Sequence, residues 1–503
     1  MNSEPENNLE ELAKQAANEL SVAPVKNTEA VNSAEKRPLY ASRQKVYPKR
    51  IAGTFRRLKW VFMSVALAIY YFTPWIRWDR GADVPNQAVL LDFPNRKFYF
   101  FWIEIWPHEI YYLTGLLILA ALALFLVTSL AGRVWCGYSC PQTVWTDLFV
   151  HVERWIEGDR NKRMKLDKAP WSASKVFKKI SKHSIWLLIS AATGGAWIFY
   201  FADAPQLAQD LFVLEAPKPA YVFLVMFTGF TYVLGGLARE QVCTYMCPWP
   251  RIQGAMFDDD ALLVTYRKYR GEPRGPHKKG ETWDGRGDCV DCKLCVAVCP
   301  VGIDIRDGPQ LECIQCALCV DACNSVMKQV GRPGNLIAYE SFNNFERRSR
   351  GETGKLRLIR PRTVLYSSLI AIVGLIMLAS LGTRSNLDVT VQKDRNPLFV
   401  TLSDGSVRNG YTLKILNKAH EPRTFSIDVE GLEGEVMTLG LGEQGNMVTA
   451  QPDSVKAVRL FLALPQDKLN QLDRGNADIS IRIDNGSPDG RAEVDTKFKG
   501  PRR

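Results

Sequence analysis

Several kinds of catalytic and binding motif are missing from this sequence of 503 residues. It contains no phosphate-binding loop, no dinucleotide fingerprint and no Ser/His/Asp set. No convincing pair of intramembrane histidines is available for haem, and the first 40 residues lack the charged-then-apolar order of a cleaved signal peptide. Residues 385–503 contain no cysteine, so this segment must be stable without disulfide bonds. These absences point away from nucleotide-dependent and hydrolytic enzymes.

All twelve cysteines, in contrast, lie in closely spaced sets, and eight of them form one doubled motif. The spacing C-x2-C-x2-C-x3-C occurs at residues 289–299 and again at residues 313–323. In bacterial ferredoxins, three cysteines of one such run and the last cysteine of the other hold each 4Fe–4S cluster. The first cluster is therefore expected at Cys289, Cys292, Cys295 and Cys323. The second is expected at Cys299, Cys313, Cys316 and Cys319.

Zinc and structural disulfides are the alternatives for these eight cysteines. Zinc would use two C-x2-C pairs with a longer gap between them, and disulfides would not need the doubled rhythm. Iron–sulfur ligands must be reduced thiolates, and cytosolic thiols are kept reduced. We therefore expect the ferredoxin segment to lie in the cytoplasm and to move single electrons.

Five apolar blocks predict transmembrane helices, because about 20 helical residues cover the roughly 30 Å hydrocarbon core of a bilayer. The blocks are residues 55–72, 110–131, 184–201, 220–238 and 363–381. Lys and Arg concentrate before the first block and in the loops 132–183 and 239–362, which the positive-inside rule places in the cytoplasm. The C-terminus is then expected in the periplasm. The net charge of +11 fits these basic loops, and the sequence shows no nucleic-acid motif.

The sequence pattern changes to period two after the fifth block. Ile479, Ile481 and Ile483 alternate with polar residues, and apolar residues also recur at every second position of 458–464. This pattern predicts half-buried strands in an all-β, immunoglobulin-like sandwich of roughly seven strands. The chain is therefore a multi-domain membrane protein, for which we expect a polar, disordered cytoplasmic tail (1–48), four helices of a five-helix transmembrane α bundle (49–250), a ferredoxin-like α+β domain (251–362), the fifth helix (363–383) and the periplasmic β domain (384–503).

The remaining four cysteines form two matching pairs. Cys136-x3-Cys140-Pro follows the second apolar block, and Cys243-x3-Cys247-Pro follows the fourth. Both blocks run from outside to inside, so both pairs are expected at the cytoplasmic membrane surface. Residues four apart share one face of a helix, so each pair is expected to direct both sulfurs to one point. If the two halves pack side by side, four thiolates can meet.

Soft thiolate ligands favour Cu(I), so one interpretation is a copper site at Cys136, Cys140, Cys243 and Cys247. A third iron–sulfur cluster, a reversible disulfide and buried structural cysteines at helix ends fit the same residues. The nearby residues His151 and Glu153 lie in an amphipathic stretch and are predicted to be surface residues.

The whole arrangement resembles the cytochrome c oxidase accessory protein family, also called CcoG, RdxA or FixG. The resemblance rests on Trp135–Pro141, on Cys243–Pro248, on the doubled ferredoxin run and on the β domain, and it covers nearly all of the chain after residue 40. Asn324 is a departure, because a proline often follows the last ferredoxin cysteine. The resemblance implies a metal-ion oxidoreductase of the bacterial inner membrane. Such a protein would reduce Cu(II) to Cu(I) during maturation of a cbb3-type haem–copper oxidase.

The partners expected from these interpretations are the lipid bilayer, a cytoplasmic electron donor, a copper ion or copper chaperone, and cytochrome oxidase assembly factors. No nucleic acid is expected, and a homodimer is left open. Two rival functions stay in competition. A ferredoxin subunit of a quinol-linked electron chain would exchange electrons with quinone and would not depend on copper. A non-enzymatic assembly scaffold would hold structural clusters whose reduction has no effect on function.

Overall fold

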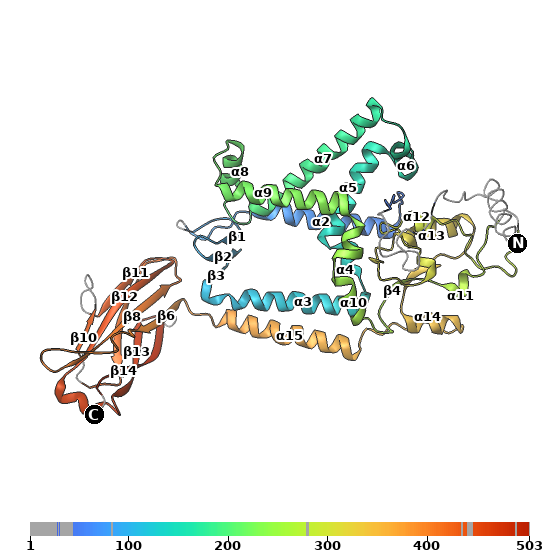
Figure 1. Cartoon of the computed structure of the whole chain (residues 1–503). Helices are drawn as coiled ribbons and strands as arrows, with labels where there is room; N and C mark the ends of the chain where they lie inside the picture. The colour runs from blue at the N-terminus through green and yellow to red at the C-terminus, as the bar shows by residue number, and fades with distance from the viewer. Residues whose placement is uncertain are drawn as a thin grey trace. The chain divides into compact units, whose positions relative to one another are not determined.

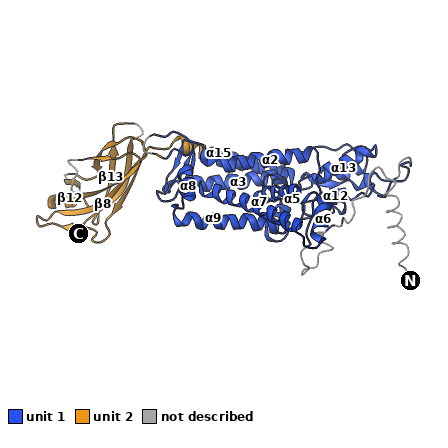
Figure 2. Ribbon diagram, turned by 90° about the horizontal axis from the view of Figure 1, so that it is seen from above, with its two compact units in different colours: residues 1–80, 85–375 blue, residues 81–84, 376–503 orange. Residues whose placement is uncertain are grey.

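The computed structural model describes residues 44–81, 84–277, 281–433, 436–439, 446–487 and 490–501, together with Thr28 and Ala30. The prediction for the N-terminal tail up to residue 43 lies outside the described residues, apart from those two positions. The chain divides into two compact units, residues 1–80 with 85–375 and residues 81–84 with 376–503 (Figure 1; Figure 2). All twelve cysteines belong to the first unit.

Helices form at all five predicted apolar blocks (Figure 1). Their bounds are Thr54–Phe72 (α2), Tyr111–Ala131 (α3), Ala173–Ile198 (α7), Lys218–Phe230 (α9) with its π-helical continuation Thr231–Ala238 (η4), and Pro361–Gly382 (α15). Among the described residues, the helices long and apolar enough to cross a membrane are Pro107–Ala131, Lys218–Ala238 and Pro361–Gly382. The count of five spans is not confirmed, because Arg56, Arg57 and Lys59 begin α2 and the first half of α7 is basic.

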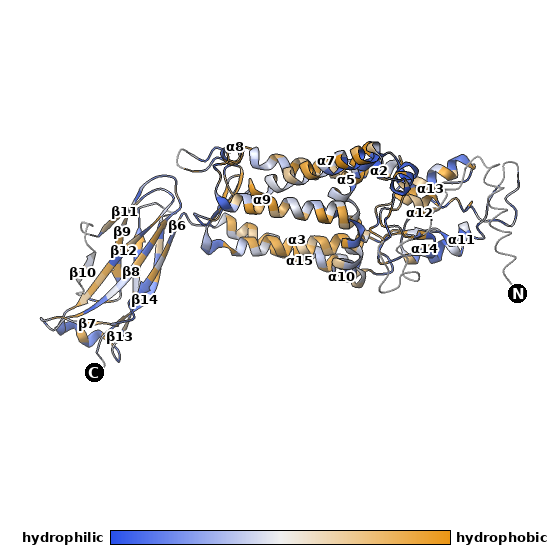
Figure 3. Ribbon diagram, turned by 45° about the horizontal axis from the view of Figure 1, so that its top comes forward, coloured by the Kyte–Doolittle hydropathy of each residue, from blue (hydrophilic) through white to orange (hydrophobic). Residues whose placement is uncertain are grey.

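Apolar residues predominate along the length of these three helices (Figure 3). In α15, Leu375, Ile376 and Leu378 are 66%, 64% and 67% exposed. A soluble protein rarely leaves such a row of large apolar side chains in water, whereas the hydrocarbon core of a bilayer solvates them. The exposure of these large apolar side chains is typical of a membrane protein.

Shorter elements fill the segments between these helices. The α-helices are Val134–Tyr138 (α4), Pro141–Glu157 (α5), Arg160–Lys168 (α6), Ala204–Phe212 (α8), Trp249–Met256 (α10), Lys268–Gly271 (α11), Leu294–Ala297 (α12), Leu318–Gln329 (α13) and Phe342–Ser349 (α14). Single 3-10 turns are Thr73–Trp75 (η2), Pro107–Glu109 (η3) and Ile305–Asp307 (η6), and a second π-helix is Val242–Met246 (η5). An antiparallel sheet of Val89–Asp92 (β1), Lys97–Phe100 (β2) and Ile103–Ile105 (β3) is not predicted by the sequence, because its strands are too short to show a period.

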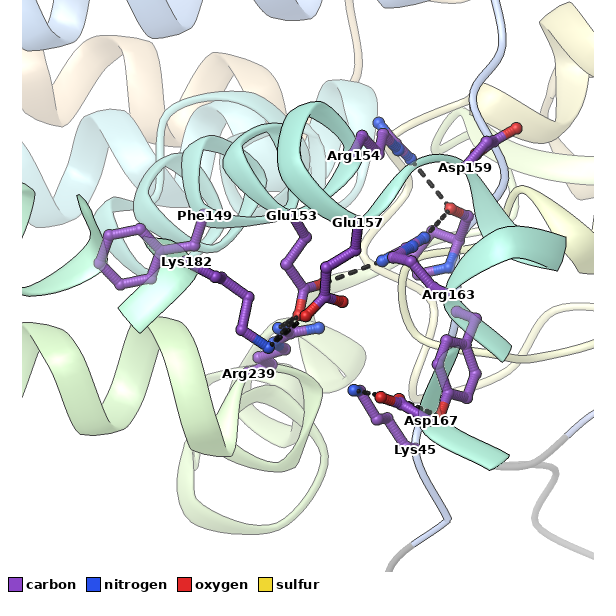
Figure 4. A network of polar contacts seen from close by, with 12 residues as sticks. Lys45, Phe149, Glu153, Arg154, Glu157, Asp159, Arg163, Asp167, Lys182 and Arg239 are labelled. Carbon is purple, nitrogen blue, oxygen red and sulfur yellow. Dashed lines mark hydrogen bonds and ion pairs between the residues drawn. The ribbon is translucent and has the colours of Figure 1, made fainter. Parts of the chain in front are cut away.

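Buried ion pairs join α5, α6, α7 and the residue that follows η4 (Figure 4). The Glu153 side chain has no exposed surface, and its oxygens lie 2.6 Å from Arg239 Nη2, 2.9 Å from Arg163 Nη1 and 3.5 Å from Lys182 Nζ. Burial by itself would raise the pKa of Glu153, but the three cations outweigh burial and lower the pKa to about 2. The predicted surface position of Glu153 is therefore wrong, whereas His151 is exposed as predicted. The amphipathic pattern of α5 cannot reveal cations that come from other elements.

The ferredoxin-like segment is a small α+β structure. Strand Leu263–Tyr266 (β4) pairs antiparallel with Ile337–Glu340 (β5), and α13 packs against β5 and α12. Val264, Val296 and Val320 contribute to the buried apolar core between them. The packing of α12 on α13 brings together the two cysteine runs, which come from successive parts of the chain.

The C-terminal unit contains an antiparallel β sandwich, as the period-two pattern predicts. The strands are Leu387–Lys393 (β6), Val400–Thr401 (β7), Val407–Asn417 (β8), Arg423–Glu430 (β9), Val436–Leu439 (β10), Met447–Ala450 (β11), Ser454–Leu464 (β12), Asn476–Asp484 (β13) and Arg491–Lys499 (β14), and a 3-10 helix spans Gln466–Gln471 (η7). One sheet has the order β10-β12-β8-β6 with β7 paired to β8, and the other has the order β11-β9-β13-β14. The described part of this unit holds nine strands rather than roughly seven, because strands as short as β7 show no alternation.

We predict that the sandwich depends on the inward-facing isoleucines of β13. Ile481 is completely buried and pairs with Val494 and Val429 on the two neighbouring strands. Ile481→Ala should lower the free energy of unfolding of this domain by about 3 kcal/mol, because it leaves a cavity in a packed core. Val455→Ala, at a position in β12 that is 56% exposed, is the matched control and should change it by less than about 0.5 kcal/mol. Pulse proteolysis in increasing urea measures both, and equal effects would contradict the prediction.

Candidate functional site

Four cysteines from both ferredoxin runs surround one apolar cavity. Its lining includes Cys289, Cys292, Cys295 and Cys323, with Val326 and Leu336 among the apolar neighbours. Cys295 lies in α12 and Cys323 lies in α13, so the contact between these helices carries the last cysteine of the second run to the first run. These are the four residues that the spacing assigns to the first cluster.

A second cavity contains the other predicted set. It is lined by Cys299, Cys313, Cys316 and Cys319, and Cys295 reaches it as well. The last cysteine of the first run has therefore crossed to the second cavity, as the ferredoxin pattern predicts. Because Cys295 lines both cavities, groups bound in the two cavities would be direct neighbours.

Matching left-handed residues shape the two cysteine runs. Asp291 and Lys293 have φ values of 52° and 54°, and the equivalent residues Gln315 and Ala317 have values of 55° and 56°. Left-handed residues within such a turn direct successive N–H groups inward and create a concavity that binds anions. The N–H of Gln315 donates to Cys313 Sγ at 3.4 Å. Four sulfurs and inward N–H groups in an apolar cavity suit an anionic 4Fe–4S cluster.

The other four cysteines lie at helix ends. Cys136 is in α4 and Cys243 is in η5, whereas Cys140 and Cys247 have extended backbone just beyond these helices. The expectation that each pair shares one face of a single helix is therefore wrong. The residue before a proline is driven out of the helical region, and Pro141 follows Cys140 just as Pro248 follows Cys247.

The two pairs nevertheless come together as one group, here called the membrane thiols (Cys136, Cys140, Cys243 and Cys247). Burial raises the pKa of Cys136 to about 12, and the neighbouring Cys140 and Cys247 add to this rise. Burial also raises the pKa of Cys243 to about 12, and the other three cysteines add to it. Within the described ranges, however, no three His, Cys, Asp or Glu side chains are close enough to hold a single metal ion.

The membrane thiols lie beside the second cysteine cavity. Cys136 and Cys243 both pack against an apolar cluster that includes Ile314, Cys316 and Leu318 from the wall of that cavity. Cys136 and Cys243 are therefore neighbours of the second ferredoxin run.

The turn inside the first C-x3-C motif contacts the backbone of the second run directly. The Tyr138 hydroxyl donates to the carbonyl oxygen of Cys316 at 3.2 Å. A Cβ atom added to Gly137 would lie 2.8 Å from the carbonyl oxygen of Ile314 and 3.0 Å from Cys316 Cα, which leaves no room for a side chain. Only a glycine at this position allows the two backbones to approach so closely.

Arg133, at the beginning of this turn, forms hydrogen bonds to the second ferredoxin run and to the segment after the second C-x3-C-P motif. Its backbone N–H donates to Gln315 Oε1 at 2.9 Å, and its guanidinium donates to the carbonyl oxygen of Leu311. The guanidinium also donates at 2.6 Å to the carbonyl oxygen of Pro250, three residues after Cys247. Arg133 therefore links both C-x3-C-P motifs to the second ferredoxin run.

Sequence reasoning found the three cysteine groups but missed this interface. Tyr138 and Cys316 are 178 positions apart, and no local pattern reports such a contact. The glycine and tyrosine between Cys136 and Cys140 were the available signal, because a small residue and a hydroxyl inside a ligand motif are suited to a close backbone contact.

Comparisons with known proteins agree with this arrangement. The family described as "4Fe-4S dicluster domain" matches residues 238–342, and "4Fe-4S binding domain" matches residues 113–163. The "IG-like fold at C-terminal of FixG" matches residues 377–501. These matches support an iron–sulfur membrane protein with an immunoglobulin-like C-terminal domain.

Two curated relatives are similar over most of their length. Nitrogen fixation protein FixG of Rhizobium meliloti (strain 1021) is 51% identical, over 89% of this chain and 92% of the relative. Protein RdxA of Cereibacter sphaeroides is 50% identical, over 92% of this chain and 99% of the relative. The crystal structure of a FixG-related protein from Vibrio parahaemolyticus is 24% identical over 23% of this chain and 97% of that chain, with a TM-score of 0.20.

We predict that Gly137→Ala separates the first C-x3-C turn from the second ferredoxin run. The added methyl group meets backbone atoms that cannot move aside like a flexible side chain. Iron content should fall from about eight per chain towards about four, because the second run loses its packed partner. Gly254→Ala is the matched control, since its added Cβ would come no closer than 3.8 Å to Arg133 Nη2. Iron analysis of both variants that shows equal, full loading would refute the prediction.

Proposed function

The chain belongs to the FixG and RdxA family, and from this premise we propose that it reduces Cu(II) to Cu(I) during maturation of a cbb3-type cytochrome oxidase. In this proposal the membrane thiols take the copper ion as substrate. The two ferredoxin cavities hold the clusters, one at Cys289, Cys292, Cys295 and Cys323 and the other at Cys299, Cys313, Cys316 and Cys319.

One observation carries the proposal, namely that the first C-x3-C turn rests on the backbone of Cys316. An electron donor and an electron acceptor must lie close together, and here a copper-binding motif and a cluster-binding run share one interface. Arg133 ties both thiol motifs to that run, which keeps their separation fixed.

The redox balance of the proposed reaction is one electron for each copper ion. When bound, the clusters would accept and release single electrons, which a cytoplasmic donor protein supplies. Cu(II) takes up one electron and becomes Cu(I), and no bond to another atom of a substrate forms or breaks. Thiolates stabilise the soft Cu(I) product over Cu(II), so the four cysteines favour the direction of reduction.

We also propose the orientation that this function needs. All five helices would cross the bacterial inner membrane, with the N-terminus and the ferredoxin-like segment in the cytoplasm and the β sandwich in the periplasm. The basic loops 132–183 and 239–362 support this orientation, because positively charged loops stay inside. The β sandwich would then contact oxidase assembly factors on the periplasmic side.

A second candidate for the membrane thiols is a third 4Fe–4S cluster. The family "4Fe-4S binding domain" matches residues 113–163, where Cys136 and Cys140 are the only cysteines. Iron content separates the candidates, because three clusters need about twelve irons per chain and two need about eight.

For the copper function we predict that replacing the four membrane thiols with serine abolishes copper reduction and spares the clusters. Serine keeps the size of cysteine but removes the soft ligand, so Cu(II) reduction should fall roughly tenfold or more. Iron should stay at about eight per chain, because no ferredoxin cysteine is changed. Anaerobic protein is assayed with Cu(II) and a chromophoric Cu(I) chelator.

Cys299→Ser is the control for this experiment, since it removes a ferredoxin cysteine and leaves all membrane thiols in place. It should lose iron as well as copper reduction. Normal Cu(II) reduction by the quadruple serine variant would exclude the membrane thiols as the copper site.

For the topology we predict that alkaline phosphatase, which is active only in the periplasm, works when fused after Arg503. The same enzyme fused after Arg350 should be inactive, because the basic segment 239–362 stays in the cytoplasm. Activity at Arg350 with silence at Arg503 would overturn the orientation.

A further inference from the structure

The two helices that lead into the thiol motifs end in the same unusual backbone turn. Gly132, which follows α3, has φ 59° and ψ −128°, and Arg239, which follows η4, has φ 49° and ψ −115°. Each residue stands four positions before the first cysteine of its motif, Cys136 or Cys243. The same turn therefore precedes both C-x3-C-P motifs, although only the first has glycine at this position.

Arginine is unusual in this turn, because residues with a Cβ atom rarely adopt this backbone conformation. At the first turn a side chain would force its neighbours to move, because a Cβ on Gly132 would lie 2.4 Å from Gln315 Oε1 and 2.8 Å from Leu263 Cδ2. At the second turn a side chain is tolerated only because the surrounding structure holds it in place.

The Arg239 side chain is held at both ends of its guanidinium. Nε donates to the carbonyl oxygen of Gly236 at 2.7 Å, and Nη2 lies 2.6 Å from the buried Glu153 carboxylate (Figure 4). Glu153 is fixed in turn by Arg163 and Lys182. The side chain therefore bonds back to its own helix end and anchors that end to α5.

Two glutamines, each following one C-x3-C-P motif, form hydrogen bonds to the helix that precedes the other motif. Gln142, two residues after Cys140, donates through Nε2 to the carbonyl oxygens of Leu234 at 2.8 Å and Arg239 at 3.1 Å. Gln253, six residues after Cys247, donates to Thr128 Oγ1 at 3.2 Å and accepts from Cys136 Sγ at 3.3 Å. Each motif thus fixes the helix end that leads into the other.

We propose that Arg239 is a positioning residue for the second thiol pair. Its side chain holds its own backbone in a conformation suited to glycine, and this turn brings Cys243 and Cys247 towards Cys136 and Cys140. The inference rests on the proposed function only in that the four thiols act together, since the geometry itself needs no copper.

The test compares Arg239→Gly with Arg239→Ala in the complete, anaerobically purified protein. Dibromobimane, which becomes fluorescent when it joins two thiols, reports cross-links between the motifs, and mass spectrometry identifies them. Glycine adopts the turn freely, so Arg239→Gly should stay within about twofold of the wild-type cross-link. Alanine has the steric cost of a Cβ without the contacts of arginine, so Arg239→Ala should lose roughly fivefold or more.

Controls separate positioning from a general loss of the ion pairs. Lys179→Met removes a neighbouring cation that pairs with Glu157 and Asp167 and not with Glu153 or Arg239, so the cross-link should persist. Gln142→Met removes the brace on Arg239 and should lower the cross-link roughly twofold or more, with iron content unchanged. This variant carries the test if Arg239→Ala does not assemble.

Equal losses in Arg239→Gly and Arg239→Ala would overturn the inference, because the charge and not the backbone would then matter. A wild-type protein without cross-links between the motifs would overturn it too. Wild-type cross-links that follow the turn, in a protein that reduces no copper, would support the positioning role and refute the proposed function.

Discussion

The arrangement of the electron-transfer groups depends on one backbone contact, between the first C-x3-C turn and residues 314–316. Gly137 approaches too closely for any side chain, and Tyr138 closes the contact with a hydrogen bond to Cys316. Cys295 lines both ferredoxin cavities and Cys136 packs against the wall of the second, so the second cavity is a neighbour of both the first cavity and the membrane thiols. In the proposed function, electron transfer from the second cluster to the membrane thiols would require this contact to stay closed.

Polar interactions, more than apolar burial, hold the helices at the level of the thiols. Lipid is as apolar as leucine, so spans gain little by burying apolar surface against one another. At the helix ends, ion pairs hold the helices together instead. Arg56 Nη1 lies 2.8 Å from Asp147 Oδ2, and three cations surround the Glu153 carboxylate. Removing one partner of such a buried pair typically costs about 3–5 kcal/mol, so the loss of one of these ion pairs would strongly destabilise the packing of the helices.

The sequence predicted the features that depend on local spacing. The crossing of Cys299 and Cys323 between the two cavities follows from the ferredoxin rhythm, and the burial of Ile481 follows from period two. Contacts between distant residues could not be predicted, such as the one that joins Tyr138 to Cys316. The same holds for Glu153, whose burial is possible only because three cations from other elements surround it. The shape of the C-x3-C-P pairs was mispredicted, because a following proline acts on the backbone of the second cysteine.

In the proposed function, electrons from the ferredoxin segment reach copper at the membrane thiols. Anaerobic stopped-flow mixing of the chemically reduced protein with Cu(II) tests it directly. Cluster absorbance and Cu(I) formation are recorded together in the same mixture. The clusters should be reoxidised at the rate at which Cu(I) appears, with one electron lost for each Cu(I). Formation of Cu(I) while the clusters stay reduced would contradict it.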